Sequence, residues 1–275
     1  MKKTIIPLFF VLFIPVLVSA KSSINAGDII KEIDSGAAVH YEDVEIVGDL
    51  DFTSVKDVTR DSKFDKDKES FTCHVKSRLE FKNCIFKGDV IAYFNNEREE
   101  TLYNAEFQKD VVFEACVFTG NCTFKYSKFF EKANFKDSQF HEESNFKYTK
   151  FSDEINFENT EFEREANFKY TKFSTEVSFK GAKFHKEATF KYTDFPEYVN
   201  FAETHFRRDA IFKYTKFPKG VNFGKAVFSK DVDFKHTKFS EPTNFDDTIF
   251  DGDVDFKYTK IDGKPFSLYL LKHKR

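Results

Sequence analysis

The sequence predicts an all-β repeat protein, a solenoid of stacked coils, from three observations. Phenylalanines follow one another at alternating spacings of five and six residues from Phe107 to Phe256, and Ile261 takes the next position. A stronger motif, typified by Phe146-Lys-Tyr-Thr, returns every twenty-two residues. Such spacings would place successive side chains on two sides of an α-helix, whereas short extended segments joined by corners can point them all inward. A fixed period in the twenties is typical of stacked repeats.

The residues around each phenylalanine fit a narrow interior. The position two before it is nearly always small or β-branched, as at Ser144 and Ile155. The segments Ala133-Asn134-Phe135-Lys136-Asp137 and Ala166-Asn167-Phe168-Lys169-Tyr170 resemble the pentapeptide-repeat family, whose unit is a small residue, Asp or Asn, Leu or Phe, and two polar residues. This resemblance implies a right-handed, four-sided parallel β-helix with four units to a coil. One extra residue in every second unit lengthens each coil to twenty-two residues.

Four segments follow from the chain order. Residues 1–20 pair Lys2 and Lys3 with an apolar run and a small-residue site at Ala20, which predicts a secretory signal peptide and an exported protein, periplasmic or extracellular. Residues 21–43 form an N-terminal capping segment with a short helix, for which Asn25 is the N-cap and Gly36 the stop. After signal-peptide removal, no segment is apolar enough to span a membrane.

The β-helix itself is expected over residues 44–261. Two polar segments break its rhythm, and we interpret residues 57–70 as a mobile loop and residues 95–100 as a second bulge. Residues 262–275 supply a C-terminal cap, in which 266–271 fold over the last coil, and a basic tail.

The sequence contains no strong motif for catalysis or metal binding. Cys73, Cys84, Cys116 and Cys122 all occupy the small inward position, which predicts buried apolar thiols, with a Cys116–Cys122 bridge as the alternative in an exported protein. His141 and His185 are expected at the surface, too far apart to share a metal ion. Asp251–Asp255 lacks the further ligands of a calcium loop. The sequence therefore predicts neither a metal site, a cofactor nor a catalytic motif.

One face stands out by charge. Stacking the Phe-Lys-Tyr-Thr-Lys motif would align one column of lysines, a neighbouring column of tyrosines, and a second lysine column interrupted by Asp194. We predict a basic, aromatic binding strip in which tyrosine supplies flat stacking surface. Its central residues are Lys147, Tyr148, Lys169, Tyr170, Lys191, Tyr192, Lys213 and Tyr214. The alternative is a solvated face multiplied by repeat copying and neutralised by an acidic column at Glu143, Glu165, Glu187, Asp209, Asp231 and Asp253.

The functional prediction is an exported, non-catalytic structural or binding module that holds an anionic envelope polymer or another protein on this strip. Its partner and oligomeric state stay open. Export argues against nucleic acid as the ligand, although the charge would permit it. The alternative is a glycan-active enzyme of the cell envelope that uses acids near the loops at 57–70 and 95–100.

Overall fold

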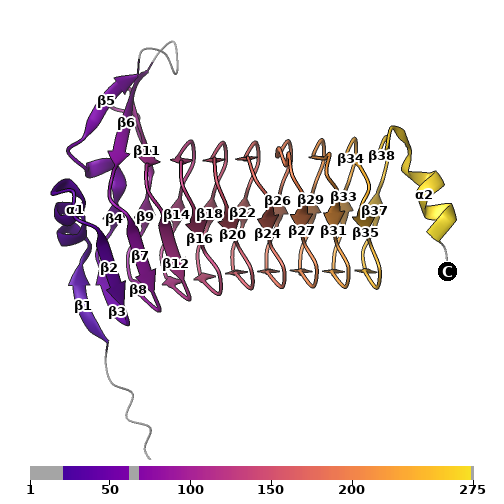
Figure 1. The fold of residues 1–275 in the computed structure, drawn as a ribbon, viewed down its shortest axis with the longest axis horizontal. Coiled ribbons are helices and arrows are strands. Elements are labelled where there is room, and N and C mark those ends of the chain that lie inside the picture. Colours follow the sequence, from indigo (N-terminus) through magenta and orange to yellow (C-terminus); the bar gives the residue numbers. More distant parts are fainter. Residues whose placement is uncertain (1–20, 62–67, 274–275) are drawn as a thin grey trace, which may run out of the picture.

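The computed structural model describes residues 21–61 and 68–273, with the side chains of 270–273 excepted. The expected signal peptide (1–20), residues 62–67 of the expected loop and residues 274–275 of the basic tail lie outside the described residues. The described chain forms one elongated prism of stacked coils (Figure 1). In the part of the chain that the structure describes, no helix is long and apolar enough to cross a membrane.

Four sheets, named A to D here, form the sides of the prism. Each coil passes from sheet B to A, then to C and D, before rising to sheet B of the next coil. Strands of successive coils pair in parallel and in register, so that Phe118 lies beside Phe140. The mostly-β, four-sided solenoid with a short N-terminal helix is therefore confirmed.

The strands are short because each side of a coil is only a few residues long. Sheet A contains β1 (Ser22–Asn25), β3 (Val44–Val47), β8 (Ile85–Phe86), β13 (Val117–Phe118), β17 (Gln139–Phe140), β21 (Glu161–Phe162), β25 (Lys183–Phe184), β28 (His205–Phe206), β32 (Val227–Phe228) and β36 (Ile249–Phe250). Sheet B contains β2 (Val39–Glu42), β7 (Leu79–Lys82), β12 (Val111–Glu114), β16 (Ala133–Asn134), β20 (Ile155–Asn156), β24 (Val177–Ser178), β27 (Val199–Asn200), β31 (Val221–Asn222) and β35 (Thr243–Asn244).

The other two sheets meet at the corner that carries the predicted strip. Sheet C contains β4 (Leu50–Asp51), β9 (Val90–Ile91), β14 (Cys122–Thr123), β18 (Ser144–Asn145), β22 (Ala166–Asn167), β26 (Ala188–Thr189), β29 (Ala210–Ile211), β33 (Val232–Asp233) and β37 (Val254–Asp255). Sheet D contains β5 (Val58–Asp61), β6 (Glu69–Val75), β10 (Tyr93–Asn96), β11 (Thr101–Phe107), β15 (Lys128–Phe129), β19 (Lys150–Phe151), β23 (Lys172–Phe173), β30 (Lys216–Phe217), β34 (Lys238–Phe239), β38 (Lys260–Ile261) and β39 (Lys264–Pro265). Isolated bridges through Asp194 join its two halves.

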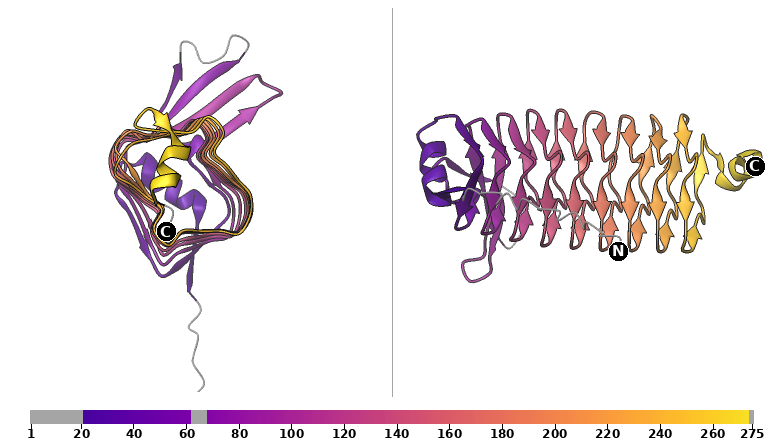
Figure 2. Two further views of the ribbon diagram at one scale, coloured as in Figure 1. Left: turned by 90° about the vertical axis from the view of Figure 1, so that its right-hand side faces the viewer. Right: turned by 90° about the horizontal axis from the view of Figure 1, so that it is seen from below.

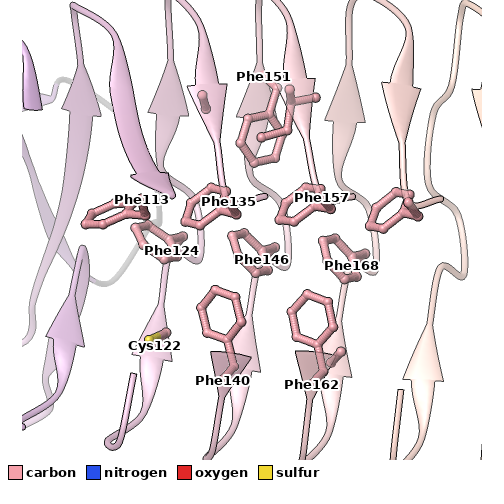
Figure 3. Packing of buried hydrophobic residues seen from close by; sticks show 14 of the residues in the cluster. Phe113, Cys122, Phe124, Phe135, Phe140, Phe146, Phe151, Phe157, Phe162 and Phe168 are labelled. Carbon is pink, nitrogen blue, oxygen red and sulfur yellow. The ribbon is translucent and has the colours of Figure 1, made fainter. Parts of the chain in front are cut away.

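The interior is a set of phenylalanine columns. Phe146 stacks on Phe124 and Phe168 with ring centroids 5.2 and 4.9 Å apart, and it meets Phe135 and Phe157 edge to face (Figure 3). Offset stacks within a column and edge-to-face contacts between columns are the favourable aromatic geometries. Small residues such as Ala166 fill the remaining space and are also buried. The repeat spacing therefore specifies both the corners and the core.

Helices cover the two ends of the prism. At the first coil, Asn25 caps α1 (Ala26–Asp34) by accepting a hydrogen bond from the Gly27 amide, and Ile29, Ile30 and Ile33 of this helix are buried. β1 precedes this helix and extends sheet A, and it was not predicted from the sequence. At the other end, Phe266 begins α2 (Phe266–His273) and stacks on Phe256 at 4.6 Å.

Two hairpins project from the prism near its N-terminal end (Figure 2). β5 pairs antiparallel with β6, and β10 pairs antiparallel with the first half of β11, while β6 and β11 pair in parallel. We call this four-stranded sheet the wing. Residues 58–61, expected in a mobile loop, therefore form a strand, and residues 95–100 form the end of a hairpin rather than a simple bulge. Cross-strand pairing orders these charged segments, which no repeat pattern marks in the sequence. A short 3-10 helix, η1 (Phe52–Ser54), leads into β5.

Candidate binding face at one corner of the prism

The turns between sheets C and D hold the predicted strip, and we call this edge the C–D corner. In each regular coil the turn is closed by a bond such as that from the Thr149 amide to the Phe146 carbonyl, 3.0 Å long. Its third residue, Tyr148, has φ of 62°, a left-handed conformation that side chains other than Gly, Asn and Asp rarely adopt. The same conformation recurs at Tyr126, Tyr170, Tyr192, Tyr214, His236 and Tyr258.

These aromatic rings form a continuous ladder along the corner. Tyr148 and Tyr170 stack with centroids 4.8 Å apart and planes 3° from parallel, and Tyr170 and Tyr192 stack at 4.9 Å and 2°. The ring faces therefore cover one another, and the ladder presents ring edges and hydroxyl groups to solvent. The expectation that tyrosine offers flat stacking surface to a ligand is wrong along the ladder. At the end of the ladder, Tyr258 is 62 % exposed.

Lysines flank the ladder on both sides. The predicted residues Lys147, Lys169, Lys191 and Lys213 each hold their ammonium group 5.2–5.5 Å from the ring centroid of the following tyrosine. This distance is within the range of cation–π attraction. The second lysine column lies on the outer side of sheet D, at Lys128, Lys150, Lys172, Lys216, Lys238 and Lys260. A shallow hollow of about 570 Å³ runs between this column and the ladder in the last coils.

The strip carries an excess of positive charge that described carboxylates do not neutralise. Of the thirteen lysines in the two columns, only Lys128 and Lys235 form an ion pair with a described residue, namely Glu106 and Asp255. On other edges, lysines pair with acids of the next coil, as in Lys109–Glu131 at 2.8 Å and Lys132–Glu154 at 2.9 Å. The charged groups of the strip are therefore available to an anionic ligand.

The acidic column lies at a different corner, between sheets A and C. Its members line shallow hollows on sheet C: Glu143, Glu165 and Glu187 line one, and Asp209, Asp231 and Asp253 line another. Burial raises the pKa of Glu187, and the neighbouring charges of Asp209 and Glu165 raise it further. Like charges stacked coil upon coil thus repel one another on this column as well. None of its acids forms an ion pair with a described lysine of the strip.

The wing belongs to the same C–D corner as the ladder. β5 and β6 replace the C–D turn of one coil, and β10 and β11 replace that of the next, before regular turns begin at Tyr126. Tyr93 of β10 lies against the first ladder ring, with its centroid 5.6 Å from that of Tyr126. The insertions and the aromatic ladder therefore share one edge of the prism, an arrangement often seen for the binding side of repeat proteins.

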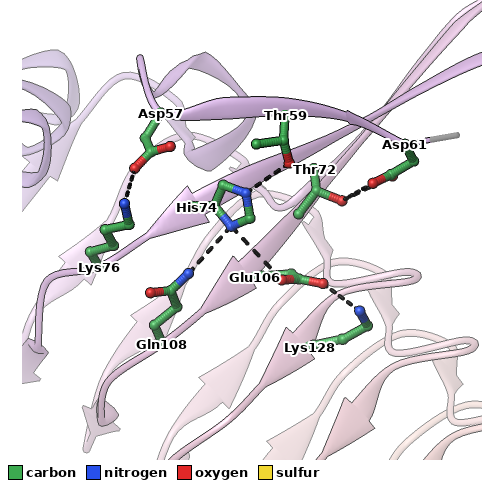
Figure 4. Close-up of polar contacts among 9 residues, drawn as sticks. All are labelled: Asp57, Thr59, Asp61, Thr72, His74, Lys76, Glu106, Gln108 and Lys128. Carbon is green, nitrogen blue, oxygen red and sulfur yellow. Dashed lines mark hydrogen bonds and ion pairs between the residues drawn. The ribbon is translucent and has the colours of Figure 1, made fainter.

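A polar cluster at the base of the wing was not predicted from the sequence (Figure 4). The His74 ring forms one hydrogen bond with the Thr59 hydroxyl at 2.8 Å and another with the Gln108 side-chain amide at 3.3 Å. The Glu106 carboxylate lies 3.8 Å from the same ring and pairs with Lys128. These residues are far apart in sequence, and no motif connects them. Strand pairing alone brings them together.

Several of the described acids near the hairpins, which the enzyme alternative requires, are engaged in structural contacts. The Asp61 carboxylate accepts hydrogen bonds from the hydroxyl groups of Ser70 and Thr72. A hydrogen bond from Lys76 lowers the pKa of Asp57. A general acid needs a raised pKa. Among the described carboxyls, burial raises the pKa of Glu187, which lies on sheet C and not near the hairpins.

The candidate cysteines lie in the core, and the candidate His185 lies against a neighbouring carboxylate. All four cysteines are buried and free, so the structure contains no Cys116–Cys122 bridge. Burial raises the pKa of Cys73 to about 12 and also raises that of Cys122. His185 lies beside Glu161 at 2.5 Å. Within the described residues, no group of three His, Cys, Asp or Glu side chains is arranged to hold a metal ion.

Comparison with known proteins identifies the repeats. The sequence model of the family described as pentapeptide repeats (9 copies) matches residues 102–150, 124–172, 146–194, 168–216 and 212–260. These overlapping segments cover more than half of the chain and include the whole ladder. No curated protein and no solved structure matches the chain in the corresponding searches.

Proposed function

The chain belongs to the pentapeptide-repeat family, and we propose that it is a non-catalytic binding module that holds a linear polyanion along the C–D corner. The proposed contacts are the ammonium groups of both lysine columns and the tyrosine hydroxyls between them. Exposed charges of one sign on a continuous edge attract an extended ligand of the opposite sign. Further, we propose that the protein is exported, which would bring it to the anionic polymers of the cell envelope.

Support comes from comparing two corners of the same coils. The turn between sheets B and A has the same closing bond and the same left-handed third residue as the C–D turn. Its third position varies freely between Asp137, Asn159, Gly181, Glu203, Lys225 and Asp247. The C–D turn keeps Tyr six times and His once. Because both turns lie in the same twenty-two-residue unit, repeat copying alone would have kept both equally constant.

The second lysine column is the observation that carries the proposal. Ring stacking explains the tyrosines of the ladder without a ligand, and cation–π contacts explain the lysines beside them in the same way. The sheet D lysines have neither contact, yet Lys occupies six of the seven positions. The equivalent positions of sheet A are Val117, Gln139, Glu161, Lys183, His205, Val227 and Ile249. A solvated face does not require this constancy, whereas an anionic ligand does.

The geometry defines the class of ligand. Successive tyrosine rings from Tyr126 to Tyr214 are 4.8–4.9 Å apart, so the strip presents its charges with about that repeat along a straight line. A polymer with about one acidic group per coil, such as a chain of uronic acid sugars, matches this spacing. Because the ring faces are covered, the contacts with a sugar would be polar and not stacking contacts. Binding should therefore weaken strongly with salt.

Binding of polyuronate by residues 21–275 at about 50 and about 500 mM salt tests the proposal. Replacing Lys150, Lys172 and Lys216 by Gln should weaken binding at low salt by at least about ten-fold, since each removes an exposed charge contact. A matched control replaces Lys136, Lys180 and Lys225, which lie on the B–A turns, and changes the net charge equally. Equal losses in both variants, or no binding at low salt, would refute a dedicated strip.

A further inference from the structure

The ladder ends at the wing, and the lysine at that end differs from all others in its column. The Lys125 ammonium group lies 4.5 Å from the ring centroid of Tyr93 and 5.1 Å from that of Tyr126. It also donates a hydrogen bond to the Tyr93 hydroxyl at 3.4 Å. The other lysines of this column with a cation–π contact lie over one ring each. Lys125 is thus positioned by two rings from two different coils.

A second ammonium group lies on the same side of the wing. Tyr93 and Asn95 are two residues apart on β10, so both point to one face of the strand. The Lys68 ammonium group donates to the Asn95 side chain at 3.0 Å. Burial lowers the pKa of Lys125, and the neighbouring positive charges of Lys147 and Lys68 lower it further. Lys68 and Lys125 thus both contact side chains on one face of β10 at its junction with the ladder, and Lys147 follows Lys125 one coil further along the column.

No described carboxylate forms an ion pair with Lys68, Lys125 or Lys147. The acids on this face of the wing already have partners, since Asp61 accepts from Thr72 and Glu106 pairs with Lys128. Placing several ammonium groups close together in a partly buried site without a counter-charge is unfavourable. An anion placed at the junction would remove this repulsion. It could also accept a hydrogen bond from Tyr93, whose oxygen already accepts from Lys125 and whose proton is free to donate.

We propose that the junction of β10 with the first ladder ring is a subsite for a compact oxyanion, held by Lys68, Lys125 and Lys147 with the Tyr93 hydroxyl. Its ligand class is a phosphate, sulfate or carboxylate group. On the function proposed above, this group is the end of the polymer that lies along the strip. The subsite is nevertheless built from its own residues, and it would also bind the free anion.

Pyrophosphate is the probe, because it is too short to use the length of the strip. Calorimetry with residues 21–275 should detect binding at low salt, and Lys125→Met should weaken it by about ten-fold or more, as expected for loss of a charged hydrogen-bonding contact. The control is Lys257→Met at the other end of the same column, which should change affinity less than two-fold. Lys257 lies over Tyr258 alone and has no wing beside it. Unchanged melting temperatures establish that both variants fold.

Tyr93→Phe separates the hydroxyl from the ring. It keeps the aromatic contact to Lys125 and should weaken pyrophosphate binding a few-fold, whereas Tyr258→Phe should have no effect. Equal effects of the Lys125 and Lys257 variants, or no pyrophosphate binding at low salt, overturn the subsite. If the unchanged protein binds pyrophosphate but does not bind polyuronate, the proposed function alone is refuted.

The source of the anion is distinguished by end-capping. Linear polyphosphate whose terminal phosphates are blocked should lose its sensitivity to Lys125→Met if the subsite takes a polymer end. If the binding of both capped and uncapped polyphosphate is insensitive to Lys125→Met while pyrophosphate still binds, the subsite takes a free small anion.

Discussion

Replacing Tyr170 by Asn tests whether the ladder stabilises the fold despite its strained turns. Tyr170 has φ of 61°, where an L-residue other than Gly, Asn or Asp costs about 1–2 kcal/mol. Asn tolerates this conformation, and Asn159 already adopts it with φ of 54° on the B–A turn. Relief of strain alone would therefore make Tyr170→Asn stabilising by about 1 kcal/mol.

The lost contacts outweigh this gain. Tyr170 stacks on Tyr148 at 4.8 Å and on Tyr192 at 4.9 Å, and each stacked pair contributes about 0.5–1.5 kcal/mol. The Lys169 ammonium group over its ring adds about 0.5–1 kcal/mol at an exposed site. The sum of these losses, reduced by the relief of strain, leaves a net destabilisation of about 2 kcal/mol. The melting temperature should fall by about 4–8 °C.

The matched control is Lys225→Asn on the B–A turn. Lys225 has φ of 58°, is exposed and has no ring to stack on, so only the strain is removed. Its melting temperature should rise by about 2–4 °C. Thermal unfolding of residues 21–275 measures both variants. If Tyr170→Asn stabilises the protein as Lys225→Asn does, the ladder contributes no folding energy and the reasoning fails.

Three further perturbations test the core, the hydroxyl contacts and the acidic column. Phe168→Ala, in a column with ring neighbours at 4.9 and 5.0 Å, should cost about 3–5 kcal/mol in denaturant unfolding, and an equal cost for the partly exposed Phe256→Ala would contradict the columnar core. Thr171→Val removes a buried bond of 2.7 Å to the Phe146 carbonyl and should cost about 1 kcal/mol, measured in the same way; no loss would mean that the hydroxyl contributes nothing. The raised pKa of Glu187 means that the folded state favours its protonated form, so its contribution to stability is present below the ordinary value of 4.5 and lost as pH rises through the folded pKa. Glu187→Gln should therefore raise the melting temperature at pH 7 but not at pH 3, and an equal gain at both would exclude charge repulsion as the cause.

The sequence predicted the regular part of the fold because each coil repeats one solution to one packing problem. The alternation of Phe with small residues such as Ala166 determines which side chains point inward, and the twenty-two-residue period determines which of them stack. The aligned columns of Lys and Tyr followed directly from this register. The wing could not be found in this way, because its strands pair across hairpins and coils without a repeated pattern. For the same reason the clusters around His74 and Lys125 were missed. They include residues of β5, β6, β10 and β11, which only the three-dimensional pairing brings together.

How the strip would contact a ligand depends on whether the tyrosine ring faces are covered, which the sequence does not show. Stacking rings at corner positions can leave their faces open or cover them, and the choice depends on side-chain angles. The structure shows nearly parallel rings 4.8 Å apart, so the faces are covered. This changes the expected contacts of an anionic polymer from charge contacts with added ring stacking to ammonium and hydroxyl contacts alone.

The wing gives the strip an end, which matters for a periodic surface. A ladder that repeats every 4.8 Å offers a polymer of matching repeat many equivalent positions, and a shift by one coil changes contacts only at the termini. Such a ligand would bind with high avidity but without fixed register. A subsite at Lys125 breaks this equivalence, because it holds one end of the polymer against β10 and leaves every other group opposite a defined coil. Removing the subsite should therefore weaken the binding of long chains by the loss of one end contact and abolish their fixed position. A paramagnetic label at one polymer end would detect this as broadening that is confined to Tyr93 and its neighbours in the intact protein and spread along the ladder in Lys125→Met.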